Sequence, residues 1–274
     1  MNYRHAFHAG NFADVLKHAV LFLLIECLKR KETPFFVLDT HAGKGRYDFW
    51  SEESVKTGEH KLGIERLLAK PINEIAPYVR AIWALNNEAL RWYPGSPRLV
   101  KTFIRPQDRL AAVELHPKDV EALRHEFADD PQVGVHCRDG YEALKGLLPP
   151  KEKRGLVLID PPFEARDEFV RLAQGIALAK ERWSNGIIVA WYPVKERPVV
   201  EAFKGEISAL PRVLDIEMLI KPENVSDELI GCGLAIIGPP WQFDVMLKPI
   251  LEALHARLDQ GGGKVKVSWL SPDK

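Results

Sequence analysis

The sequence is poor in cysteine and has no long apolar run. Its three cysteines in 274 residues form no CxxC pair, which excludes a disulfide framework and a zinc ribbon. No apolar stretch reaches the length of a transmembrane helix, and the N-terminus lacks the apolar core of a signal peptide. We therefore expect a cytoplasmic protein with buried thiols, no membrane association and no metal.

An excess of charge is also missing, because 38 basic residues balance 38 acidic ones. A neutral chain has no global field to attract nucleic acid, so any such partner must meet a local basic patch. Hydrophobic content of 46% is ordinary for a globular protein. Because we find no repeat, low-complexity tract or linker, we expect residues 1–274 to form a single domain and the chain to act as a monomer.

Nucleotide-binding loops are represented only in part. No GxxxxGK[ST] occurs, which excludes a P-loop. Residues 34–39 predict a short buried strand that ends at Asp39 and opens into a loop containing Gly43 and Gly45. This is the shape of the first turn of a doubly wound fold, although Asp48 stands where a dinucleotide fingerprint needs its third glycine. Such a loop suits an uncharged or zwitterionic nucleoside better than a pyrophosphate.

The N-terminal segment, residues 1–11, is unusually rich in aromatic and basic side chains for a disordered tail. Asn11 is placed to cap a helix over residues 12–31, whose apolar positions recur at helical spacing. Lys17 and His18 lie within that helix. From the residues alone, a solvated lysine and an ordinary boundary histidine are the expected readings.

Residues 48–107 interrupt the alternation of strands and helices. Their apolar spacing predicts two or three amphipathic helices with no strand between them, which indicates a helical insertion after the first strand. The insertion ends in a tight turn at residues 92–97, where Ser96 is expected to cap a short helix over residues 98–103.

Acidic residues then follow successive predicted strands. Residues 109–114 form a strand that ends at Glu114, a position suited to the two hydroxyls of a ribose. Asp139 follows a strand over residues 132–137. It can accept a hydrogen bond from an adenine amino group or cap the next helix, and the sequence does not decide between these.

The most informative strand covers residues 156–160. Its apolar run suits the middle of a parallel sheet, and Pro161 must stop it because proline has no N–H to donate. A carboxylate, free backbone carbonyls and the ring of Phe163 are thus presented together at the edge where ligands bind. This set can hold an exocyclic amino group and stack on its ring, although a plain Pro-Pro turn is the alternative.

The predicted elements resemble a Rossmann-like class I methyltransferase, an α/β fold with a seven-stranded, mostly parallel sheet and helices on both faces. The remaining strands cover residues 186–193, 213–220, 229–237 and 265–270, and the 213–220 and 229–237 pair looks antiparallel. In this resemblance the loop of Asp39, Gly43 and Gly45 is the S-adenosyl-L-methionine loop. The segment from Asp160 to Phe163 is similar to the [DNS]PP[YFW] motif of enzymes that methylate planar nitrogens.

A closer resemblance, to the RlmJ family of 23S ribosomal RNA adenine-N6 methyltransferases, covers nearly the whole chain. It rests on residues 3–18, 38–47, 93–97 and 159–162. It implies that Asp160, Pro161 and Phe163 are catalytic and that the N-terminal segment meets the RNA. The implied cofactor contacts are His18, His41, Gly43, Ser96, Glu114, Asp139, Gly140 and Asp160, and the implied substrate contacts are Tyr3, Arg4, His5, Lys17 and Phe163.

Other functions fit the residues less well. A DNA adenine-N6 or protein glutamine methyltransferase would use the same motif, but residues 48–107 are few for a DNA target-recognition domain. A purely RNA-binding module has no need of Asp160 and its two prolines beside a nucleoside loop. A nicotinamide oxidoreductase lacks its third glycine, and a zinc base deaminase lacks its ligand motifs.

Overall fold

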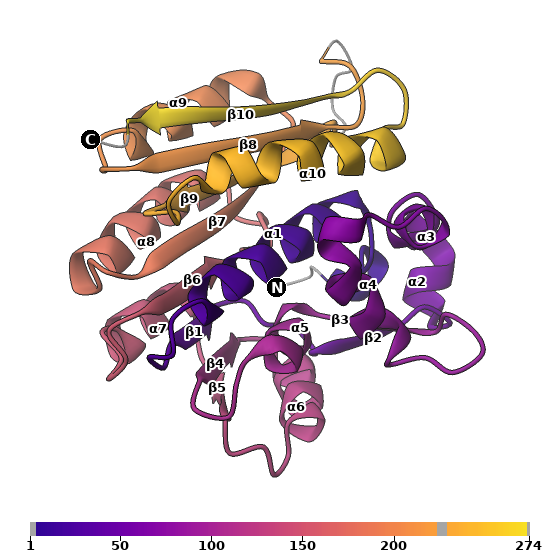
Figure 1. The fold of residues 1–274 in the computed structure, drawn as a ribbon, viewed down its shortest axis with the longest axis horizontal. Helices are drawn as coiled ribbons and strands as arrows, with labels where there is room; N and C mark the ends of the chain where they lie inside the picture. The colour runs from indigo at the N-terminus through magenta and orange to yellow at the C-terminus, as the bar shows by residue number, and fades with distance from the viewer. Residues whose placement is uncertain (1–3, 224–228, 273–274) are drawn as a thin grey trace.

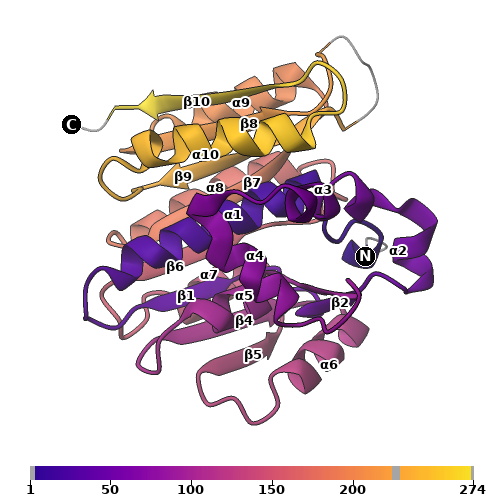
Figure 2. The same ribbon diagram turned by 45° about the vertical axis from the view of Figure 1, so that its right-hand side comes forward.

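The computed structural model describes residues 4–223 and 229–272, and its centre is an eight-stranded sheet (Figures 1 and 2). The strand order is β10-β8-β9-β7-β6-β1-β4-β5. Strands β5, β4, β1, β6 and β7 run parallel, whereas β9 pairs antiparallel with both β7 and β8. The bounds are β1 Phe36–Asp39, β4 Arg109–Glu114, β5 Val133–Cys137, β6 Gly155–Ile159, β7 Ile187–Val194, β8 Val213–Leu219, β9 Gly231–Ile237 and β10 Lys264–Ser271.

The expected mostly parallel sheet is confirmed, with one strand more than the seven expected. The additional strand is β10, which pairs antiparallel with β8 at the edge of the sheet. The sequence indicates a strand there, but it cannot show that this strand joins the main sheet. Two more short strands, β2 Arg46–Asp48 and β3 Trp92–Pro94, form a separate antiparallel ribbon. At three residues each, they are too short to give a periodic pattern.

Helices cover both faces of the sheet (Figure 1). On one face the core contains α1, α10 and the helices of the insertion, and on the other it contains α7, α8 and α9. The bounds are α1 Phe12–Lys29, α2 Glu52–Thr57, α3 Ile64–Ala69, α4 Ala76–Trp83, α5 Ser96–Phe103, α6 Pro117–Glu126, α7 Gly140–Leu147, α8 Glu168–Arg182, α9 Arg197–Ile207 and α10 Phe243–Leu258, with 3₁₀ turns η1 His5–Phe7, η2 Glu59–Lys61 and η3 Asn73–Ile75.

Helix α1 is buried along nearly its whole length. Its predicted cap is confirmed, because the Asn11 side chain accepts a hydrogen bond from the Asp14 N–H at 3.0 Å. The helix is packed between the sheet and the helices α4, α5 and α10. A helix in this position has no solvent-exposed face that could carry a charge. Lys17 is therefore buried, not solvated as the residues alone had indicated.

The expectations for Ser96 and Cys137 are also wrong. Gly95, not Ser96, is the N-cap residue of α5, and the Ser96 hydroxyl instead donates to Asp39. Cys137 is exposed, although all three thiols were expected to be buried. The reason is that Cys137 ends β5, the edge strand of the sheet.

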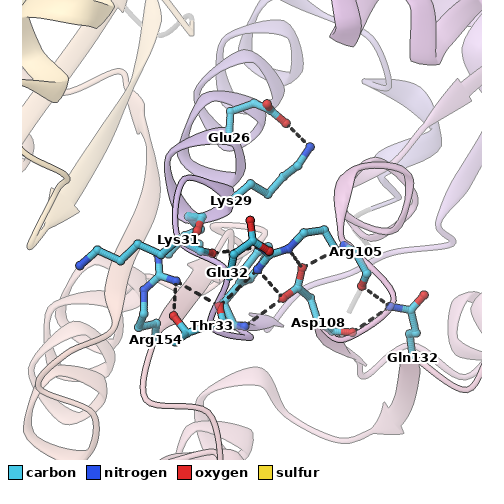
Figure 3. Close-up of polar contacts among 11 residues, drawn as sticks. Glu26, Lys29, Lys31, Glu32, Thr33, Arg105, Asp108, Gln132 and Arg154 are labelled. Carbon is cyan, nitrogen blue, oxygen red and sulfur yellow. Dashed lines mark hydrogen bonds and ion pairs between the residues drawn. The ribbon is translucent and has the colours of Figure 1, made fainter.

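A polar cluster around buried Asp108 links the amino-terminal ends of the central strands (Figure 3). Asp108 accepts hydrogen bonds from the backbone N–H of Phe35 at 3.0 Å and from the Arg105 guanidinium at 2.9 Å. Arg154, which precedes β6, donates to the carbonyl oxygens of Leu28 and Thr33. These hydrogen bonds join the end of α1 to the amino-terminal ends of β1, β4 and β6 and so stabilise the fold there. The carboxyl ends of the strands remain available for ligands.

Candidate functional site

A cavity of about 1000 Å³ lies along the carboxyl ends of β1, β4, β5, β6 and β7. It brings together every predicted cofactor contact and most of the predicted catalytic and substrate contacts. Arg4 does not line it; its guanidinium lies 3.4 Å from Glu53. Tyr3 lies outside the described residues. The predicted residues that line the cavity are His5, Lys17, His18, His41, Gly43, Ser96, Glu114, Asp139, Gly140, Asp160, Pro161 and Phe163.

Asp160 occupies the predicted position directly after β6, between β1 and β7. Three residues on, Phe163 has φ of +51°, a left-handed conformation that is costly for an aromatic residue. Its ring contacts Phe169 and Trp191, with centroid distances of 4.8 and 5.7 Å. The strained turn is thus held by aromatic packing, and it leaves the half-buried ring at the cavity wall.

The ammonium of Lys17 joins Asp160 to Asp14. Its Nζ lies 2.5 Å from Oδ2 of Asp160 and 2.8 Å from Oδ1 of Asp14. Burial by itself would lower the pKa of Lys17, but the two carboxylates outweigh it and raise that pKa well above its usual range. Burial likewise opposes ionisation of Asp14, yet the charges of His5 and Lys17 hold its pKa well below normal. Asp14 and Lys17 are therefore both ionised at neutral pH.

The N-terminal segment is docked on this cluster and on the insertion. His5 Nε2 lies 2.9 Å from Oδ2 of Asp14, which also accepts the backbone N–H of Gly10 at 2.9 Å. His8 Nδ1 lies 2.9 Å from Oε1 of Glu59, which begins the 3₁₀ turn η2 before α3. These contacts place His5 and His8 in the wall of the cavity.

Asp39, at the end of β1, is fully buried beside the cavity. Its Oδ2 accepts the Ser96 hydroxyl at 2.6 Å. Burial raises the pKa of Asp39 to about 7, with a smaller contribution from the charge of Asp160, while the Ser96 hydrogen bond acts in the opposite direction. A carboxyl with a pKa raised towards neutrality next to a cavity is typical of a functional site.

The loop after β1 wraps closely around Glu114. Oε2 of Glu114 accepts the N–H of Gly43 at 2.8 Å, and Oε1 accepts the N–H of His116 at 2.7 Å. Gly43 has φ of +60°, and a Cβ there would stand 2.1 Å from the Tyr47 hydroxyl oxygen. Only glycine fits this turn, which fixes the Glu114 carboxylate at the cavity.

His41 has a defined tautomer. The Thr40 hydroxyl donates to the carbonyl of Leu158 at 2.9 Å, so it accepts from Nδ1–H of His41 at 2.8 Å. Burial lowers the pKa of His41 to about 4, and its ring is therefore neutral. A Cβ on Gly140 would lie 2.4 Å from the Thr40 carbonyl oxygen, so a glycine is required for this close approach.

Asp139 is an N-cap, one of the two roles left open by the sequence. Its Oδ1 accepts the N–H groups of Tyr141 and Glu142 at the start of α7, and its Oδ2 lies 3.2 Å from Arg171. Because the carboxylate also lines the cavity, capping and contact with a ligand are compatible. The adenine-reading role stays a prediction.

His18, in α1, faces two buried tyrosines from other elements. Its Nδ1 lies 2.9 Å from the Tyr93 hydroxyl, which lies 3.0 Å from the Tyr78 hydroxyl. Burial lowers the pKa of His18 to about 3, so the ring is neutral at the cavity. The boundary-histidine reading is wrong, because the side chain is 1% exposed.

Several cavity residues were not singled out from the sequence. Asp14 differs from a surface acid only by its place one turn before Lys17, and its burial depends on how α1 packs. Trp191 follows the last β6–β7 register pair, Ile159 with Ala190, and so stands beside Asp160. Its position near the carboxyl end of the strand expected over residues 186–193 was the available signal.

These residues fit the expected cofactor. Acids at the ends of neighbouring parallel strands, together with two glycines at close approaches, suit the hydroxyls, amino groups and cationic part of an adenosyl sulfonium compound. Within residues 4–223 and 229–272 no helix is long and apolar enough to cross a membrane. No group of three or more His, Cys, Asp or Glu side chains in the same described ranges is arranged to hold a metal ion. The strand order and this site define an S-adenosylmethionine-dependent methyltransferase of the Rossmann-like class.

Comparison with known proteins gives the family. Residues 32–271 match the family described as Ribosomal RNA large subunit methyltransferase D, RlmJ, and the chain belongs to it. It is 44% identical to Ribosomal RNA large subunit methyltransferase J of Haemophilus influenzae and 40% identical to that of Escherichia coli, over the full length of each pair. The crystal structure of protein LPL1258 from Legionella pneumophila superposes with a TM-score of 0.89 at 35% identity, over 96% of this chain and 98% of that one.

Proposed function

We propose that this protein transfers the methyl group of S-adenosyl-L-methionine to N6 of an adenine in 23S ribosomal RNA. Its membership of the RlmJ family supports the reaction and the RNA substrate. The observation that carries the proposal is the position of Asp160 and Pro161 at the end of β6, in the wall of a cavity that also holds the cofactor residues. We further propose a cytoplasmic monomer, in which residues 1–274 form one methyltransferase domain with an insertion at residues 48–107.

The adenine amino group is a weak nucleophile because its lone pair is delocalised into the ring. Hydrogen bonds from its two N–H groups to the Asp160 carboxylate and the Pro161 carbonyl would pull the nitrogen towards tetrahedral geometry. They also stabilise the positive charge that develops on the nitrogen as the new C–N bond forms, so they strengthen in the transition state. When bound, S-adenosyl-L-methionine supplies an electrophilic methyl group. Asp160 can accept the proton that the methylated nitrogen then loses.

The cofactor residues divide according to the chemistry they offer. We assign the ribose hydroxyls to Glu114 and the adenine amino group to Asp139, with His41, Gly43 and Gly140 forming the surrounding wall. The remaining predicted contacts, His18 and Ser96, lie towards α1 and β1. Asp39 was not predicted as a cofactor contact. Its carboxyl group accepts the Ser96 hydroxyl and so places a further acid in the same region.

The substrate residues surround the Asp160 end of the cavity. We assign the stacking surface for the target adenine to Phe163, and contacts to the RNA near the active site to His5 and Lys17. Tyr3 and Arg4 keep their predicted roles as substrate contacts; Arg4 directly precedes His5, which lines the cavity.

The experiment that tests this function is methylation in vitro with labelled cofactor. Transcribed 23S ribosomal RNA, duplex DNA and a glutamine-containing protein are offered in parallel, and the RNA product is digested and analysed for N6-methyladenosine. We expect label only in the RNA. Label in DNA or in glutamine side chains would favour the alternative substrates, and methylation of RNA at another atom would contradict the assigned clamp.

A further inference from the structure

The β2–β3 ribbon carries a stack of alternating cations and aromatic rings on its outer face. The guanidinium of Arg46 lies 4.6 Å from the ring centroid of Trp92, and that of Arg91 lies 4.7 Å from the same ring. Arg91 also lies 4.9 Å from the ring of Trp50. The order is therefore Arg46, Trp92, Arg91, Trp50, and we name these four residues the Arg–Trp stack.

The stack is ordered but ends in solvent. Asp48 holds Arg91 in place with hydrogen bonds of 2.8 to 3.2 Å to its Nε and Nη2 atoms, and Glu126 lies 3.2 Å from Nε of Arg46. Trp50, at the end, is nevertheless 60% exposed. Trp50 therefore contacts Arg91 and still presents most of its surface to solvent, where a further planar group can stack.

The opposite face of the same ribbon belongs to the methyl-transfer site. Side chains alternate along a strand, so Tyr47 and Tyr93 point inward while Arg46 and Trp92 point outward. Tyr47 lines the cavity, and so does Glu59, which follows Trp50 in sequence after helix α2. The Arg–Trp stack is thus separated from the cavity by the thickness of one ribbon.

We propose that the Arg–Trp stack binds an unpaired nucleotide of the substrate RNA outside the base pocket, with its base stacked on Trp50. This inference rests on the proposed function, because it assumes an RNA substrate. A chain with no net charge must hold RNA through local contacts. Single-stranded bases are recognised by stacking on aromatic rings and guanidinium planes, which are the two groups that alternate here.

The charges indicate how the contact works. Asp48 and Glu126 offset the charges of Arg91 and Arg46, so the stack offers planar surfaces more than net positive charge. The binding should therefore depend on ring stacking and only weakly on salt. A site that acted through charge alone would show the reverse.

The test measures RNA affinity by fluorescence anisotropy and methylation kinetics for wild type, Trp50→Ala, Arg91→Lys and Trp241→Ala. Trp241 is the matched control, because it is also a highly exposed tryptophan (75%, against 60% for Trp50) and it precedes α10, which is not part of the ribbon. For a structured fragment of 23S ribosomal RNA we expect Trp50→Ala to weaken binding roughly five- to hundredfold. The slope of affinity against salt and the thermal midpoint should stay unchanged, and Trp241→Ala should be silent.

Two comparisons make the result decisive. A short adenosine oligonucleotide, which fills only the pocket, should be used equally well by wild type and Trp50→Ala. Arg91→Lys keeps the charge but loses the plane, so it should weaken the long RNA as Trp50→Ala does. The inference is overturned if Trp50→Ala behaves like Trp241→Ala, or if Trp50→Ala weakens the binding of both RNAs equally. RNA that binds through Trp50 without being methylated would overturn the proposed function alone.

Discussion

The ammonium of Lys17 forms a 2.5 Å hydrogen bond with Oδ2 of Asp160, the carboxylate to which we assign the target amino group. The base and the lysine must therefore share one carboxylate. Because Lys17 is also paired with Asp14, it holds Asp160 at a fixed place in the cavity wall. A preorganised acceptor of this kind stabilises developing charge without reorganising at the moment of reaction.

Replacing Asp160 should abolish methyl transfer and leave the fold intact. Asp160→Ala and the isosteric Asp160→Asn both remove the charge that stabilises the developing cation, and we expect kcat to fall by at least about 100-fold. Calorimetry with S-adenosyl-L-methionine and circular dichroism provide the controls for cofactor binding and folding. A rate near that of wild type in either variant would contradict the clamp.

Replacing Lys17 should affect stability as well as catalysis. Lys17→Ala removes the ammonium that is paired with the buried Asp14 carboxylate, a change that costs about 3–5 kcal/mol in comparable buried pairs. The double variant Asp14→Asn with Lys17→Met removes both charges and should recover most of the free energy of unfolding. Chemical denaturation of the three proteins measures this.

The same double variant separates the two roles of Lys17. We expect it to bind S-adenosyl-L-methionine almost normally and to transfer methyl groups to RNA poorly, because Asp160 has lost its fixed partner. Equal losses in cofactor affinity and in transfer would mean that Lys17 serves the cofactor instead of the substrate.

The affinity for the cofactor should rise with pH through the titration of Asp39. Its pKa is raised to about 7, so the carboxyl is mostly neutral at pH 6 and mostly charged at pH 8. If the charged form binds the cationic cofactor, affinity should increase roughly tenfold over this range, in proportion to the ionised fraction. Titration calorimetry at several pH values measures the effect, and Asp39→Asn should remove it.

Two further predictions follow from the raised pKa of Asp39. Ser96→Ala deletes the hydrogen bond that lowers the pKa of Asp39, so it should move the midpoint to higher pH. The folded pKa lies above the ordinary value of 3.8, so the contribution of Asp39 to stability is present below that value and is lost as the pH rises through about 7. Without cofactor, Asp39→Asn should therefore be more stable than wild type at pH 8. If Ser96→Ala leaves the midpoint of the pH dependence of cofactor affinity unchanged, the titrating group is not Asp39.

Phe163 should act through its ring and not through a hydroxyl. Phe163→Ala loses base stacking worth about 1–3 kcal/mol, which we expect to raise the KM for RNA with little change in cofactor affinity. Phe163→Tyr adds only the hydroxyl common in this motif and should keep its activity. An inactive Phe163→Tyr, or a fully active Phe163→Ala, would argue against a stacking role in this aromatic pocket.

The sequence by itself determined the alternation of strands and helices and the acids that end them. Each of these follows from local rules: Asn11 caps α1, prolines stop β6 after Ile159, and apolar runs mark buried parallel strands. Because the carboxyl ends of parallel strands meet at one edge, the convergence of Asp39, Glu114 and Asp160 could also be predicted. The family-specific residues then agreed with this arrangement.

Only the tertiary structure decided which side chains pair at that edge. Lys17 and Asp160 are 143 positions apart, and Ser96 and Asp39 are 57 apart, so no local pattern links them. The packing of α1 against the sheet turned Lys17 from an expected surface charge into a buried ion pair. Likewise, the β2–β3 ribbon exists through pairing across the insertion, and that pairing alone brings Arg46, Trp92, Arg91 and Trp50 into one stack.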